Sequence, residues 1–140
     1  MDTRETLLAE LTANGVRHTP GNVIAIGRDW QNRVVWLETG DSRSGFTHIQ
    51  RHSDEFAANG IAAEDIPALL MEILLKGRII GHTRADRPEQ ETRRPVFAWG
   101  RNDEVGHYAV TVGNNGYVVG AHPINLRKVI LLEVDNAEND

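Results

Sequence analysis

Three segments of the chain repeat their apolar residues at the spacing of an α-helix, which gives each one a hydrophobic face and a polar face. They are residues 2–14, 46–58 and 63–76, and a glycine follows each of them closely. The third is the most apolar and carries Pro67 in its first turn, where proline is tolerated. The pattern therefore predicts three helices in the first half of the chain.

Shorter runs rich in β-branched and aromatic residues predict strands. Residues 23–26 and 33–37 should form an early hairpin. Later strands are predicted at residues 78–82, 95–99, 108–112, 117–120 and 129–134, with a charged loop at 86–94 and a turn at 100–104. Asn115-Gly116 favours a tight hairpin turn.

Helices and one hairpin come first, and mainly antiparallel strands follow. We therefore expect an α+β fold with N-terminal helices packed on a mainly antiparallel β-sheet. A chain of 140 residues suits a single domain, residues 1–140.

Composition narrows the function only slightly. The chain is 40% hydrophobic and 25% charged, as in ordinary globular proteins, and the absence of Cys removes disulfides and thiolate metal sites. A net charge of −5 argues against a general nucleic-acid-binding surface. Positive charge is nevertheless concentrated at Arg84, Arg87, Arg93 and Arg94, and at Arg127 and Lys128.

No stretch approaches the roughly 18 apolar residues that a membrane span needs, and the N-terminus has no signal-peptide pattern. We expect a soluble protein that has no membrane partner and acts in the cytoplasm. Delivery by a phage or a secretion system is compatible with this expectation.

The richest chemistry lies in residues 46–58. On one helix, His48 and His52 are four residues apart and share a face, and Arg51 reaches the same side. Two imidazoles that titrate near neutral pH and one permanent cation suit phosphate chemistry. The preceding glycine-rich loop leaves helix N–H groups free to hold an anion.

Two other interpretations of this helix were weighed. The plainer one is an ordinary, partly exposed helix face. The other is a zinc site, but Ile49 stands where metalloproteases have Glu, and no third ligand is apparent. We expect no metal and no cofactor.

His122 follows a predicted strand and lies between Ala121 and Pro123. Loops after strands often carry functional groups, so His122 is the second candidate group, although a solvated loop residue is an equal alternative. The residues expected to bind substrate are Tyr108, Tyr117, Asn125 and Arg127.

The order of several motifs resembles the phage and polymorphic-toxin nuclease domains grouped with barnase, EndoU, colicin ribonucleases and RelE. The resemblance covers residues 30–125 and is carried by Trp36-Leu37-Glu38-Thr39-Gly40, by Gly45-Phe46-Thr47-His48-Ile49 with Arg51, His52 and Phe56, by a Leu-rich helix that ends at Gly77, and by Tyr117-Val118-Val119-Gly120-Ala121-His122-Pro123. Its strongest part is the histidine helix.

This resemblance implies an α+β fold and metal-independent cleavage of RNA, tRNA included. It also implies an immunity or antitoxin protein as partner. Related domains often have Thr or Ser where this chain has Gly120, so one expected hydroxyl is missing.

The sequence therefore predicts a toxin- or phage-associated endoribonuclease in which the RNA 2′-hydroxyl attacks the adjacent phosphorus and leaves a cyclic phosphate. His48, His122 and His52 are the acid–base candidates and Arg51 is the phosphate clamp. We prefer the pair His48 and His122. Two alternatives stay open: a non-catalytic phage- or toxin-associated binding module with the same fold, and a different transferase or hydrolase that uses the same helix.

Overall fold

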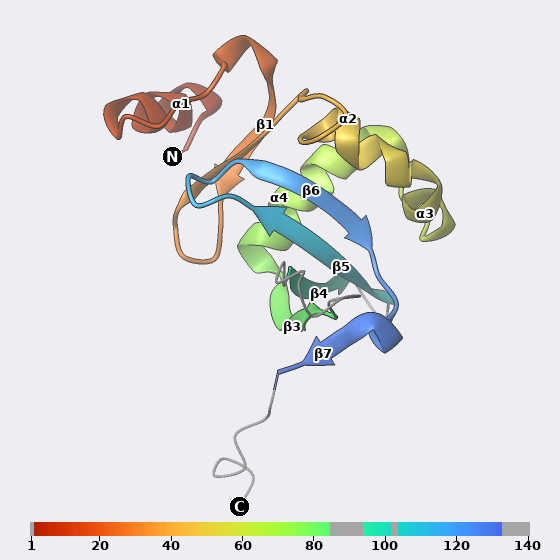
Figure 1. Ribbon diagram of the computed structural model, residues 1–140. Coiled ribbons are helices and arrows are strands. Elements are labelled where there is room, and N and C mark those ends of the chain that lie inside the picture. Colours follow the sequence, from red (N-terminus) through yellow and green to blue (C-terminus); the bar gives the residue numbers. More distant parts are fainter. Residues whose placement is uncertain (1, 85–93, 102–103, 133–140) are drawn as a thin grey trace, which may run out of the picture.

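The computed structural model describes residues 2–84, 94–101 and 104–132 (Figure 1). Its α-helices are α1 (Arg4–Ala13), α2 (Phe46–Ile49), α3 (Ser53–Ala58) and α4 (Ile66–Lys76). Its strands are β1 (Val23–Arg28), β2 (Val34–Glu38), β3 (Arg78–Thr83), β4 (Pro95–Arg101), β5 (Glu104–Val112), β6 (Val118–Pro123) and β7 (Val129–Leu131).

The strands form two antiparallel units. β1 and β2 make a two-stranded hairpin, and the other strands make a five-stranded sheet in the order β6-β5-β4-β3-β7. Trp36 of β2 also pairs with Tyr117, just before β6, which connects the hairpin to the edge of the larger sheet. The α+β prediction is thus confirmed, with helices packed against an antiparallel sheet and a hairpin.

The main core lies between one face of the sheet and the helices, and in Figure 1 α4 crosses behind the strands. Its buried members come from β2, α2, α3, α4 and the sheet, and include Leu37, Ile49, Phe56, Leu70, Ile73, Phe97, Tyr108 and Val110. The N-terminal helix packs separately on the hairpin through Leu7 and Leu11. Thr3 caps this helix through a hydrogen bond from the backbone N–H of Thr6.

The face of the large sheet that is turned away from α4, here called the open face, has its own small apolar cluster, in which Val96, Ala109 and Val129 are buried. None of the described helices packs over this cluster (Figure 1). Side chains alternate along a strand, so Tyr108 and Val110 point to the main core while Ala109 points to the open face. Within the described residues, no helix is long and apolar enough to cross a membrane.

The predicted helix at 46–58 is helical throughout, but it is not one α-helix. A 3-10 turn, Gln50–His52, separates α2 from α3. Residues four apart do not keep the α-helical relation across such a tighter turn. The prediction of one continuous α-helix is therefore wrong, although His48 and His52 both lie beside β6.

Other boundaries also differ from the predictions. The third helix begins at Ile66, after a 3-10 turn, Ala63–Asp65. The predicted turn at 100–104 is shorter, because β4 and β5 continue until Arg101 pairs with Glu104. Residues 86–93 of the predicted charged loop, and residues 133–134 of the predicted last strand, lie outside the described residues.

Candidate functional site

The imidazole of His48 is held by the loop that precedes its helix. Gly45 precedes α2 at a φ of 83°, and its N–H donates to Val119 of β6. The same loop brings the Ser42 carbonyl to 2.9 Å from His48 Nδ1. A carbonyl can only accept, so Nδ1 carries the proton and donates it, which leaves Nε2 as the free nitrogen of the neutral ring.

The His48 ring lies over Gly120 of β6. A Cβ atom built on Gly120 would be 3.3 Å from His48 Cδ2 and 3.6 Å from His48 Nε2. Gly120 pairs with Thr111 and His122 pairs with Ala109, so both face the open side of the sheet. The structure therefore brings His48 and His122 to the same face of the same strand.

His122 has a second imidazole as its neighbour. The rings of His52 and His122 have centroids 5.0 Å apart and are tilted by 47°. His52 Nδ1 donates to the Glu55 carboxylate at 3.1 Å, and His122 Nδ1 donates to the Pro123 carbonyl at 3.2 Å. His18 and His82 make similar bonds to carbonyls. What distinguishes His48, His52 and His122, here called the histidine cluster, is that His48 lies over Gly120 and the His52 ring lies beside His122, two residues further along β6.

Burial, and next the nearby His52, lower the pKa of His122 to about 4, while the Glu55 carboxylate opposes the change. The positive charges of Arg94 and Lys128 also contribute to the low pKa. His122 is therefore neutral at pH 7.

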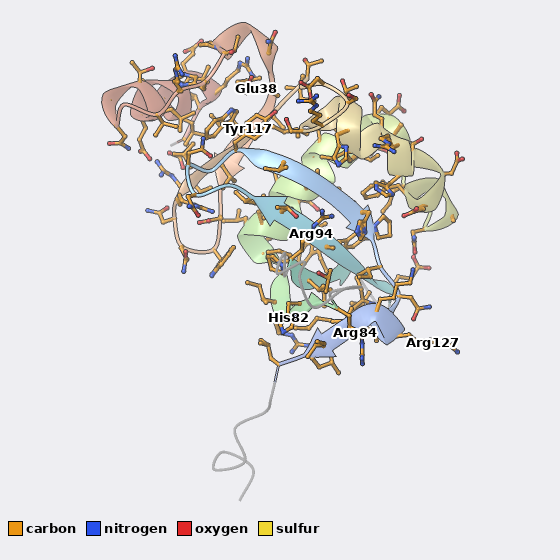
Figure 2. All side chains as sticks on the ribbon, in the orientation of Figure 1. Glu38, His82, Arg84, Arg94, Tyr117 and Arg127 are labelled. Carbon is orange, nitrogen blue, oxygen red and sulfur yellow. The ribbon has the colours of Figure 1, made fainter. Side chains whose placement is uncertain are left out.

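The described arginines around the sheet can be followed in Figure 2, which shows Arg94 over the sheet, and Arg84 and Arg127 near β7.

Arg51, the predicted phosphate clamp, is exposed. Within the part of the chain that the structure describes, its guanidinium makes no hydrogen bond or ion pair. It follows His48 by three residues and directly precedes His52, so its charge is carried on the same helical run as both imidazoles. Its five donors remain available to a ligand.

Two side chains beside the cluster escaped the sequence analysis. Glu55 orients His52, and its spacing of three residues along a helical run was the signal that could have identified it. Thr111 is directly opposite Gly120, at a cross-strand spacing of roughly 5 Å between Cβ positions. A hydroxyl thus stands one strand away from the position where it was expected. Only the register of β5 and β6 reveals this.

The predicted substrate-binding residues do not gather at the cluster. Tyr108 points to the opposite face of the sheet, where its ring stacks on Phe56, so we remove it from the site. Tyr117 packs edge-on against Trp36 and shares a hydrogen bond of 3.2 Å with Ser44 in the loop before α2. The Asn125 side chain caps a 3-10 turn, whereas Arg127 is exposed.

Among the described residues, no three His, Asp or Glu side chains are arranged to hold a metal ion. The chemical groups at the cluster are three imidazoles with free Nε2 atoms, one carboxylate and exposed cations. Such groups can exchange protons and bind an anion. Comparison of the sequence with protein-family models and with curated proteins gave no match in either case.

Proposed function

We propose that this protein is a metal-independent endoribonuclease that cleaves RNA by attack of a 2′-hydroxyl on the adjacent phosphorus. The observation that carries the proposal is the histidine cluster: the His48 ring lies over Gly120, two residues before His122 on the same face of β6, and the His52 ring lies beside His122. The acid and the base are both partly buried and lie on one face of the sheet, where each can reach the same phosphate. The resemblance to toxin and phage nuclease domains agrees with this assignment.

His122 acts as the general base. Its ring is neutral at pH 7, and its Nδ1 proton is committed to Pro123, so Nε2 is free to take the proton from the 2′-hydroxyl. A bound phosphate raises the low pKa of His122 toward neutrality, because a nearby negative charge favours the imidazolium. The base thereby becomes stronger when the substrate is in place.

His48 acts as the general acid. Side chains two residues apart on a strand are separated by roughly 7 Å, and the His48 ring occupies the space above Gly120, two residues from His122. This spacing accommodates one phosphate with a hydrogen bond on each side. The O2′–P bond forms as the P–O5′ bond breaks, and the leaving oxygen receives the Nε2 proton of the His48 imidazolium.

His52 and Arg51 provide positive charge for the transition state. The Glu55 carboxylate accepts a hydrogen bond from Nδ1 of His52, which fixes the orientation of the ring. Arg51 presents an exposed, planar guanidinium that matches phosphate geometry. On this proposal the partners are RNA and, from the resemblance alone, an immunity or antitoxin protein.

A non-catalytic RNA- or protein-binding module is the second candidate. Gly120 lacks the hydroxyl that related domains carry, and the net charge of −5 is low for an RNA enzyme. Thr111, one strand away, weakens the first of these points.

The experiment is to incubate the purified protein with total tRNA in EDTA and to analyse the new RNA ends. We expect fragments with 2′,3′-cyclic phosphate and 5′-hydroxyl ends, and no cleavage of DNA, which lacks the attacking group. Activity that EDTA abolishes and a divalent ion restores would overturn the proposal. RNA that is bound but never cut would favour the binding module.

A further inference from the structure

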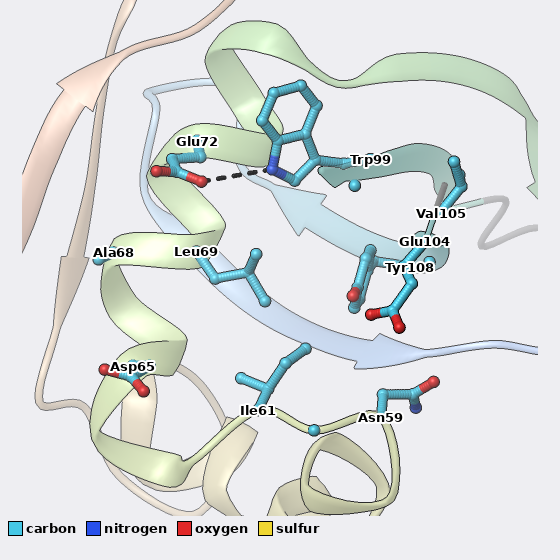
Figure 3. A pocket seen from close by; sticks show the side chains of 13 residues that line it. Asn59, Ile61, Asp65, Ala68, Leu69, Glu72, Trp99, Glu104, Val105 and Tyr108 are labelled. Atoms are coloured by element: carbon cyan, nitrogen blue, oxygen red, sulfur yellow. Dashed lines mark hydrogen bonds between the residues drawn. The ribbon is translucent and has the colours of Figure 1, made fainter. Parts of the chain in front are cut away.

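A cavity of about 840 Å³ lies on the helix side of the sheet, away from the histidine cluster (Figure 3). Its walls come from α4, from the segment between α3 and α4, and from β4 and β5. The side chains that the argument uses are Ile61, Asp65, Leu69, Trp99, Glu104 and Tyr108. The volume lies in the usual range for small-molecule sites.

Tyr108 is a nearly buried polar group that faces this cavity. The residue is 5% exposed, and its ring stacks on Phe56 with centroids 6.3 Å apart and planes 13° from parallel. Its hydroxyl has no hydrogen-bond partner among the described residues. Gly106 keeps the hydroxyl accessible, because a Cβ there would collide with it. Burial raises the pKa of Tyr108, so the group stays protonated.

The acidic side chains on the remaining walls favour a positively charged ligand. Figure 3 shows Asp65 and Glu104 on opposite walls, with the apolar side chains of Leu69 and Ile61 between them. No Lys or Arg is among the described lining residues. Trp99 donates from Nε1 to Glu72 at 3.4 Å, which holds its indole at the cavity wall. Aromatic faces attract ammonium groups, and carboxylates pair with them.

We infer that this cavity binds an aliphatic polyamine, whose ammonium groups pair with Asp65 and Glu104 while its hydrocarbon chain covers Leu69 and Ile61. The Tyr108 hydroxyl hydrogen-bonds the bound amine, and the rings of Trp99 and Tyr108 contact the chain. Two separated negative groups with an apolar floor between them fit a chain with a charge at each end better than a compact metal ion. The site is independent of RNA cleavage.

The test is calorimetric titration with spermidine in the absence of RNA, beside two comparison ligands. One is 1,8-octanediol, a neutral chain, and the other is Mg²⁺ at matched ionic strength. We expect binding of spermidine only. Glu104→Gln and Asp65→Asn should each weaken it roughly tenfold, as for loss of a charge-assisted contact. Tyr108→Phe, which keeps the stack on Phe56, should weaken it about threefold or more.

Two controls separate this inference from general electrostatics and from the proposed function. Glu5→Gln, which removes the same charge from an exposed position on α1, should bind spermidine like the wild type. His122→Ala should also bind it unchanged, even if the protein cleaves no RNA. Equal binding of spermidine to the wild type and Glu104→Gln, or binding matched by Mg²⁺ or the diol, would overturn the inference.

Discussion

His122 has an environment that makes its protonation costly. Its ring is partly buried, lies 5.0 Å from the His52 ring, and is close enough to Arg94 and Lys128 for their charges to act on it. Each of these features disfavours an added proton, and the Glu55 carboxylate favours it. The low pKa is therefore a property of the whole cluster.

Because folding lowers the pKa of His122, the free energy of unfolding should depend on pH. The folded pKa is about 4, against a reference value of 6.5, so between these values the unfolded chain binds a proton that the folded chain does not. The contribution of neutral His122 to the free energy of unfolding is fully present above about pH 6.5 and is lost as the pH falls toward 4. Urea unfolding of His122→Gln at about pH 7 and pH 5 should show a smaller fall in free energy than the wild type. Equal falls in both proteins would refute this.

Gly120 provides a test of the His48 position that does not touch the imidazole itself. A methyl group in Gly120→Ala would be 3.3 Å from His48 Cδ2, so the ring must shift by a few tenths of an ångström. Because the backbone there is ordinary extended strand, we expect unfolding free energy within about 1 kcal/mol of the wild type. RNA cleavage should fall roughly tenfold through misplacement of the acid. Unchanged cleavage in a stable variant would remove His48 from the mechanism.

The loop before α2 is the element that positions the acid. Gly45 has φ 83° and ψ −164°, a backbone conformation that only glycine adopts readily. A Cβ there would be 2.9 Å from the Glu38 carbonyl and from Gly40 Cα. This close approach lets β2, the loop and β6 meet beneath His48.

The corresponding prediction compares two glycines. Gly45→Ala should lower the unfolding free energy by at least about 2 kcal/mol, through backbone strain and the collision with Glu38. Gly21→Ala is the matched control, because a Cβ there meets nothing within 4 Å, and it should change stability by no more than about 0.5 kcal/mol. Denaturant unfolding of both variants measures the difference. A similar stability for the two would contradict the role assigned to the loop.

Element types were largely predictable from periodicity, but relations between elements were not. The cap at Thr3 and the stop at Gly77 follow from local rules, and both hold in the structure. The 3-10 turn between α2 and α3 has no comparable sequence signal, since Phe46, Ile49 and Phe56 fit a continuous helix equally well. The sequence therefore identified His48 and His52 but not the contact of His52 with His122.

At the scale of the whole molecule, the sheet separates two surfaces. Tyr108 and Ala109 are consecutive, yet one faces the polyamine cavity and the other lies beside His122 on the open face. Which residue faces which side depends on strand register, because a shift of one residue exchanges the faces. For that reason the sequence placed Tyr108 with His122 and missed Thr111.

The most direct test of the central claim is the rate of RNA cleavage in EDTA by His122→Ala and His82→Ala under identical single-turnover conditions. His82 is on β3, three strands from β6 in the sheet, and serves as the matched histidine control. Loss of the general base should slow His122→Ala at least about a hundredfold, whereas His82→Ala should stay within about twofold of the wild type. Equal rates for His122→Ala and the wild type would contradict the account.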